Sequence, residues 1–225
     1  MNGGAVSPLR LYRGQGAGTR LRTALRWRTA PLDRVAGLLP ATGTVLDWGC
    51  GHGLVALQAA RRSPEVQVVG CEIDGAKVRS ATAAAAAAGL SDRVAFEVVD
   101  AAARPSGSWD GIVLCDVLYL QAPGDRSDLV AAAAAALAPG GVLVCKEVDR
   151  TPRWKWVLCS FQEQISVRIL RITRPGTGLG ELPDPAEVAA WMGAAGLAVE
   201  RVPLGWGSHV PHVALLGRRS ATAVP

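Results

Sequence analysis

The chain has 225 residues, a formal net charge of +5 and 49% hydrophobic residues, which suits one α/β domain with a sizeable core. No uncharged apolar run is long enough to span a membrane, and the N-terminus has no apolar signal-peptide core, so we expect neither a membrane protein nor a secreted one. The five cysteines include no Cys-x-x-Cys pair, which indicates a reducing compartment, the cytoplasm, rather than a disulfide framework.

Residues 1–39 are predicted to form a basic N-terminal arm and a cap helix, ahead of a main domain over residues 40–225. The first 28 residues contain six arginines and no acidic residue. An arm for nucleic acid or an anionic membrane surface has this composition, and so does an organelle transit peptide. We favour a helix over residues 21–39 that covers a crevice at the sheet edge, because the stretch has an apolar face: Leu21, Leu25, Trp27, Leu32, Val35 and Leu38–Leu39.

The stretch 44–53 predicts a strand, a tight turn and the start of a helix. An apolar run ending in Asp47 leads into glycines at alternate positions, Gly49, Gly51 and Gly53, where positive φ and bare backbone allow a nucleotide to approach. A dinucleotide-binding loop would have its third glycine at Leu54, and the Gly-Lys-Ser/Thr of a P-loop is absent. Asp47 is a poor neighbour for a pyrophosphate but a good one for an ammonium or sulfonium cation.

The pattern Asp-x-Gly-x-Gly-x-Gly resembles the first motif of class I methyltransferases, which use S-adenosylmethionine (SAM). Further features of that family follow in the expected order over residues 40–147. A strand over 66–72 ends in Glu72, and a strand over 93–101 carries Asp100 near its end. A strand that begins at 109 leads into a loop at Asp116, and a Pro139-Gly140-Gly141 turn follows later. The resemblance implies a doubly wound seven-stranded α/β sheet, mostly parallel with the last strand antiparallel (a Rossmann-like fold). Quinone-biosynthesis-like and natural-product small-molecule enzymes are the most similar members.

The same resemblance implies a set of cofactor-binding residues at successive strand ends. Glu72 is expected to hold the ribose, while its competitor Asp74 is expected to cap the helix over 75–88. Asp100 is expected at the adenine, with a turn residue as the alternative. The full predicted set is Asp47, Gly49, Cys50, Gly51, Glu72, Ile73, Asp100, Ala101, Cys115 and Asp116.

Metal-dependent catechol-type relatives need an acid–amide pair after the fifth strand. The segment 146–150 has no amide, so no metal is predicted. Enzymes that methylate exocyclic or amide nitrogens often carry Asn/Asp-Pro-Pro-Tyr after the fourth strand, and residues 115–118 do not match it.

The segment 149–183 is predicted to be a lid over the substrate, with Trp154 in its wall; a packed helix with a basic solvent-facing side is the alternative. A helix starting at Asp184 and two strands, 197–203 and 210–217, are expected to follow. A histidine beside the substrate mouth would suit a general base for a hydroxyl, although structural histidines are more common. The catalytic candidates are Tyr119, Glu147, His209 and His212.

These features predict transfer of the sulfonium methyl group of SAM to an oxygen, carbon or nitrogen of a small, hydrophobic or aromatic molecule. One alternative is an RNA methyltransferase that uses the basic arm. Another is a protein of the same fold that binds SAM without transferring methyl, as a cyclase or a binding partner. A membrane surface is a further possible partner if the substrate is hydrophobic. The sequence does not predict the oligomeric state.

Overall fold

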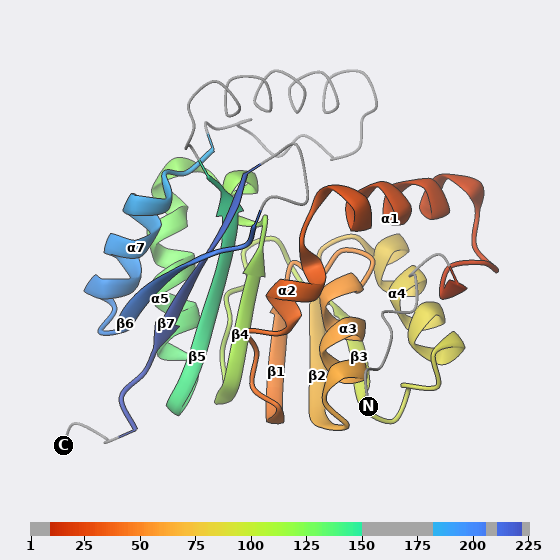
Figure 1. The fold of residues 1–225 in the computed structure, drawn as a ribbon, viewed down its shortest axis with the longest axis horizontal. Helices are drawn as coiled ribbons and strands as arrows, with labels where there is room; N and C mark the ends of the chain where they lie inside the picture. Colours follow the sequence, from red (N-terminus) through yellow and green to blue (C-terminus); the bar gives the residue numbers. More distant parts are fainter. Residues whose placement is uncertain (1–9, 150–181, 206–210, 222–225) are drawn as a thin grey trace.

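A computed structural model describes residues 10–149, 182–205 and 211–221, and Figure 1 shows its layers. One sheet of seven strands has the order β3-β2-β1-β4-β5-β7-β6. The pairs from β3 to β5 are parallel, and β7 runs antiparallel to both β5 and β6. The predicted doubly wound sheet, mostly parallel with its last strand antiparallel, is confirmed.

The elements follow the order expected of alternating strands and helices. The strands are β1 (Thr42–Trp48), β2 (Glu65–Glu72), β3 (Val94–Val98), β4 (Trp109–Cys115), β5 (Leu137–Val148), β6 (Ala198–Pro203) and β7 (His212–Arg218). The α-helices are α1 (Ala17–Thr29), α2 (Leu32–Ala36), α3 (Leu54–Arg62), α4 (Gly75–Ala87), α5 (Arg126–Ala135) and α7 (Pro185–Ala194). Two 3-10 turns, η2 (Leu118–Leu120) and η3 (Pro123–Asp125), lie between β4 and α5.

Each face of the sheet has its own apolar cluster. Helices α2, α3 and α4 contribute to one cluster and α5 and α7 to the other. Because side chains alternate along a strand, neighbouring residues of β1 serve both: Val45 belongs to the first cluster and Leu46 to the second. The central strands are therefore buried on both faces, and ligands have access to them only at the edges where the strands end.

Two predicted helix starts are confirmed by their caps. The Asp74 carboxylate accepts from the N–H of Ala76 at 2.9 Å, at the start of α4. At α7, Asp184 accepts from Ala186 at 2.9 Å, and the side chain of Glu187 accepts from the Asp184 N–H. Such caps satisfy N–H groups that have no partner within the helix.

The prediction of one N-terminal helix over residues 21–39 was wrong. Ala30 is extended (φ −122°, ψ 139°) and separates α1 from α2, because the following Pro31 disfavours a helical conformation in the residue before it. The proposed apolar face is also divided between two environments. The apolar residues of α2 are buried, whereas Leu21 and Leu25 of α1 are 70% and 53% exposed.

Three predicted features lie outside the described residues: nearly all of the lid at 149–183, Trp154, and His209. Within the part of the chain that is described, no helix combines the length and the apolar character needed to cross a membrane.

Candidate functional site at the carboxyl edge of the sheet

The three glycines after β1 have different tasks. Gly49, Gly51 and Gly53 all have positive φ (76°, 57° and 81°). A Cβ at Gly53 would lie 2.6 Å from the ring of Phe96, so this glycine allows α3 to pack closely. A Cβ at Gly51 would meet only the Glu72 carboxylate, at 4.0 Å. The backbone at Gly51 is therefore the part of the loop open to a ligand.

The loop is tied to the end of β2 by backbone hydrogen bonds. The N–H groups of Gly49 and Cys50 both donate to the carbonyl of Cys71, at 2.8 and 3.0 Å. Burial raises the pKa of the Cys50 thiol far above its usual value, so the side chain stays protonated and packs as a small apolar group. Cys50 thus takes part in the loop through its backbone.

Asp47 lies beneath the loop. It is 1% exposed, and its carboxylate accepts from the N–H of Ala56 in the first turn of α3 at 3.1 Å. Burial raises the pKa of this carboxyl to about 7, and the hydrogen bond from Ala56 opposes that shift. In this structure, Asp47 joins the strand to the helix through this hydrogen bond.

Glu72 is the carboxylate beside that open backbone. Its Oε1 accepts from the N–H groups of Ile73 (2.9 Å) and Asp74 (3.1 Å), and its Oε2 accepts from Gly51 (3.1 Å). The Lys77 ammonium lies 3.7 Å from Oε2. Because each carboxylate oxygen can accept about two hydrogen bonds, Oε1 is filled and Oε2 has one position left. Glu72 can therefore hold the loop and still accept from a ligand hydroxyl.

The predicted adenine residues are exposed just past β3. The Asp100 carboxylate accepts from the N–H of Ala102 at 2.8 Å, which is the turn contact considered as an alternative. Asp100 and Ala101 are both exposed. One oxygen of Asp100 forms the turn and leaves the other available to a ligand.

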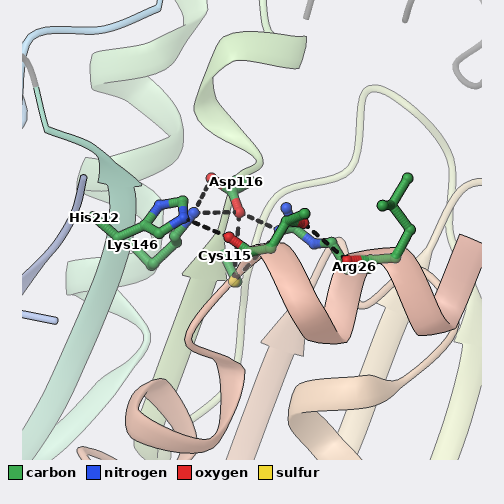
Figure 2. A network of polar contacts seen from close by, with 7 residues as sticks. Arg26, Cys115, Asp116, Lys146 and His212 are labelled. Atoms are coloured by element: carbon green, nitrogen blue, oxygen red, sulfur yellow. Dashed lines mark hydrogen bonds and ion pairs between the residues drawn. The ribbon is translucent and has the colours of Figure 1, made fainter. Parts of the chain in front are cut away.

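Asp116 is the centre of a buried ion cluster, shown in Figure 2. Both of its oxygens lie 2.7 Å from Nζ of Lys146, which is fully buried in β5, and Oδ2 also pairs with Arg26 of α1. Burial opposes ionisation, but the two cationic charges outweigh it and hold the pKa of Asp116 below its usual range. Asp116 is also the only non-glycine residue with positive φ (56°) among the described residues.

Asp116 was predicted to contact the cofactor, and in this structure its carboxylate pairs with Arg26 and Lys146. Its neighbour Cys115 is half-buried, and burial raises the pKa of that thiol to about 12. Neither Arg26 nor Lys146 was among the predicted site residues. Lys146 directly follows the apolar run 142–145, and a lysine inside a strand was a signal for it. Arg26 is one of many arginines near the N-terminus and has no such signal.

His212 begins β7 beside the cluster (Figure 2). Its Nε2 lies 2.8 Å from the carbonyl of Thr29, at the end of α1. A carbonyl only accepts, so this contact places the proton on Nε2 and leaves a lone pair on Nδ1. Nδ1 is buried and has no hydrogen-bond partner. Burial and the charge of Lys146 lower the pKa of His212 to about 4, so its ring is neutral at pH 7.

Of the remaining catalytic candidates, Tyr119 lies in η2, directly after β4, and is half-buried. Glu147 is 1% exposed in β5. Parallel strands place their carboxyl ends at one edge, so Tyr119 and Glu147 lie at the edge that carries the glycine loop. His212 reaches the same edge because β7 is antiparallel and its first residue pairs with Val148, the last residue of β5.

The segment from Tyr12 to Thr29 crosses this edge (Figure 1). Tyr12 is fully buried, and its hydroxyl donates to the carbonyl of His52 in the glycine loop. Gln15 donates to the carbonyl of Ser80 in α4 at 2.9 Å. Arg26 and Thr29 add contacts to Asp116 and His212. The segment is therefore attached to the glycine loop, to α4, to the loop after β4 and to the start of β7.

A hollow of about 520 Å³ opens at the opposite, amino edge of the sheet. Its lining includes Thr42, Gly43, Asp110, Gly140 and Arg218. None of the predicted site residues lines it, and Asp110 is engaged with the N–H of Thr44 at 2.8 Å. The chemistry is therefore assigned to the carboxyl edge.

Among the described residues, no group of three or more His, Cys, Asp or Glu side chains is placed to hold a metal ion. The prediction of transfer without a metal stays a prediction that a chelator can test.

Comparison with known proteins adds independent information. The family described as "Methyltransferase domain" matches residues 20–202. A ubiquinone biosynthesis O-methyltransferase of Xanthomonas axonopodis pv. citri is 32% identical over 168 residues, which cover 74% of this chain and 67% of that one. An O-methyltransferase family protein from Burkholderia thailandensis has a similar structure, with a TM-score of 0.72 and 24% identity over 92% of this chain. This chain spans 62% of the length of that structure.

The same fold also occurs in a protein named for another reaction. The [4+2]-cyclase SpnF matches with a TM-score of 0.61 and 18% identity, over 92% of this chain and 83% of that one. The fold alone therefore does not determine the reaction.

Proposed function

This chain belongs to the methyltransferase domain family, and we propose that it transfers the methyl group of SAM to a hydroxyl oxygen of a small apolar or aromatic molecule. The cofactor of this family is SAM. The observation that carries the proposal is the open backbone at Gly51, which lies between the strand β1 and the carboxylate of Glu72. The hydroxyl acceptor is supported by the O-methyltransferases that this chain resembles.

We assign the two ends of the nucleoside to two strand ends. Glu72 would accept from a ribose hydroxyl with the free position on Oε2, and Asp100 would accept from the adenine amine with its second oxygen. The exposed side chain of Ile73 (59%) would cover the purine. When bound, SAM supplies an electrophilic methyl group and a neutral thioether leaving group. The protein supplies alignment and the exclusion of water.

On the acceptor side, His212 is the candidate general base. The Thr29 carbonyl fixes its proton on Nε2 and leaves a lone pair on the buried Nδ1. An acceptor that reaches Nδ1 would give its hydroxyl proton to this lone pair as the oxygen–methyl bond forms. Tyr119 and Glu147 are candidates for orienting the acceptor. The four cysteines in the described part are free thiols, which supports a cytoplasmic setting for this activity.

The direct test is formation of S-adenosylhomocysteine by the purified chain with a panel of phenols, hydroxyquinones and polyketide alcohols. We expect turnover with at least one acceptor, insensitive to EDTA, and a methyl ether as the product. Turnover with structured RNA and with none of the small molecules would favour the RNA alternative. SAM binding without S-adenosylhomocysteine, together with conversion of an acceptor, would favour a cyclase-like role.

Replacing Glu72 by glutamine is expected to weaken SAM binding by about 10- to 100-fold, since hydrogen bonds to a charged group contribute about 1.5–3 kcal/mol. An amide has one accepting oxygen, whereas Glu72 accepts from three N–H groups. Isothermal titration calorimetry with SAM measures the loss. Glu97→Gln is the matched control, because Glu97 is an exposed carboxylate on β3. Equal affinities for the two variants would contradict the assignment.

A further inference from the structure

The outward side of α1 exposes leucines among arginines. Leu21 and Leu25 are 70% and 53% exposed and stand one helical turn apart on the same side. Residue 28 continues that side, and residues 20 and 22 flank it on either hand, since 3.6 residues make one turn. We call these exposed residues the α1 face: Arg20, Leu21, Arg22, Leu25 and Arg28.

The opposite side of the same helix is fastened to the protein. Thr23 is 1% exposed, and Arg26 pairs with the buried Asp116. The helix therefore cannot turn its leucines inward without breaking this ion pair. Its exposed side is a fixed surface of the fold.

The other large exposed apolar residues have an explanation in the proposed site. Ile73 directly follows β2, Val98 ends β3, and Leu120 lies in η2 after β4. All three stand at strand ends where the proposed cofactor and acceptor would cover them. Leu21 and Leu25 face away from that crevice, and burying such side chains would be favourable by about 1.5–3 kcal/mol each. The proposed site therefore does not account for the exposure of these two leucines.

The charge around the leucines favours an anionic partner. Residues 10–32 contain six arginines and no acidic residue. No ion pair involves Arg20, Arg22 or Arg28 in the structure as described. Apolar side chains with arginines on the polar flanks are typical of helices that lie in the surface of an anionic bilayer. RNA phosphates would pair with the arginines but offer nothing to the leucines.

We propose that the α1 face docks this chain on an anionic lipid bilayer, with the leucines among the acyl chains and the arginines at the headgroups. Since α1 lies over the carboxyl edge of the sheet (Figure 1), docking turns the mouth of the site toward the lipid. An apolar acceptor dissolved in the bilayer then reaches the site without crossing water. This role in acceptor delivery rests on the proposed function, whereas the docking itself does not.

The test is co-sedimentation of the full chain with vesicles of phosphatidylcholine alone and of phosphatidylcholine with phosphatidylglycerol in a two-to-one ratio. We expect binding to the anionic vesicles only, weakened by salt. Leu21→Ser with Leu25→Ser should lower the partition coefficient by about tenfold or more. Arg20→Gln with Arg22→Gln should lower it by about 25-fold, at about fivefold for each arginine near an anionic surface. Arg218→Gln is the matched control, since Arg218 is exposed at the amino edge.

Several outcomes would overturn the proposal. One is equal binding by the wild type and the leucine variant, and another is no binding to either vesicle. A dimer in sedimentation velocity that the leucine substitutions dissociate would show that a second copy covers the face. RNA binding lost with the arginines but not with the leucines would assign the face to nucleic acid. S-adenosylhomocysteine formation with a water-soluble acceptor, measured in parallel, shows whether the proposed function fails separately.

Discussion

Asp116→Asn is expected to destabilise the folded chain by about 3–5 kcal/mol, the usual cost of leaving a buried charge without its partner. The substitution keeps the shape of the side chain and removes its charge, while Lys146 stays fully buried. Urea unfolding at pH 7 measures the change as a lower midpoint with an unchanged slope. Because the pKa of Asp116 is depressed, the stabilisation is present above the ordinary carboxyl pKa of 3.8 and is lost as the pH falls through the folded-state value.

Two further variants test whether the loss of stability comes from the burial of the charges or from the loss of an ion pair alone. Asp33→Asn breaks an ion pair of 3.0 Å with Arg62, but both side chains are more than 40% exposed, so the cost should be about 1 kcal/mol or less. Lys146→Met in the Asp116→Asn background removes the unpaired charge and should restore much of the stability. Equal losses for Asp116→Asn and Asp33→Asn would contradict this account of the cluster.

His212→Gln is expected to lower kcat by about 100-fold, at the low end of the range for a general base, roughly 10²–10⁴. The low end applies because a base with a pKa of about 4 is a weak proton acceptor. Glutamine can still donate to the Thr29 carbonyl from the position of Nε2, but it has no equivalent of the Nδ1 lone pair. Single-turnover methyl transfer measures the change, and calorimetry should give an unchanged SAM affinity.

The pH dependence distinguishes a base from a structural histidine. A general base with this pKa predicts a rate that is level from about pH 5 to 8 and falls as the ring gains a proton near pH 4. Stability should respond as well: between pH 6.5 and 4 the unfolded chain binds this proton and the folded chain does not, so stability falls as the pH falls. His212→Gln should remove that part of the slope. A His212→Gln variant with the wild-type rate of methyl transfer would contradict the assignment of His212 as a general base and leave it a structural role only.

The sheet was predictable because its evidence is local. Each parallel strand is a short apolar run with a turn signal, and Asp74 and Asp184 are caps that can be read from adjacent residues. The break at Ala30 was also local, since Pro31 marks it, but the apolar pattern on both sides suggested one continuous helix. There the restriction on the residue before proline determined the structure.

The site was only partly predictable because its charges come from distant segments. Glu72 contacts Gly51, which is 21 residues earlier in the same strand–helix–strand unit, and the glycine motif of that unit predicts the contact. Arg26 and Asp116 are 90 residues apart, and His212 and Thr29 are 183 apart. Such pairs follow from the way the N-terminal segment crosses the sheet edge, and one sequence carries no signal for that path. The assignments of the cofactor-binding residues and of the catalytic residues therefore stay predictions.

The position of β7 in the sheet has a consequence for the order of assembly. It is the last strand of the described chain, yet it lies between β5 and β6. During synthesis on a ribosome, β5 therefore presents an open edge and β6 has no partner until residues 212–218 have emerged. An unpaired edge is a template for aggregation, so we expect nascent chains stalled before this point to be bound by chaperones and cleaved readily by proteases.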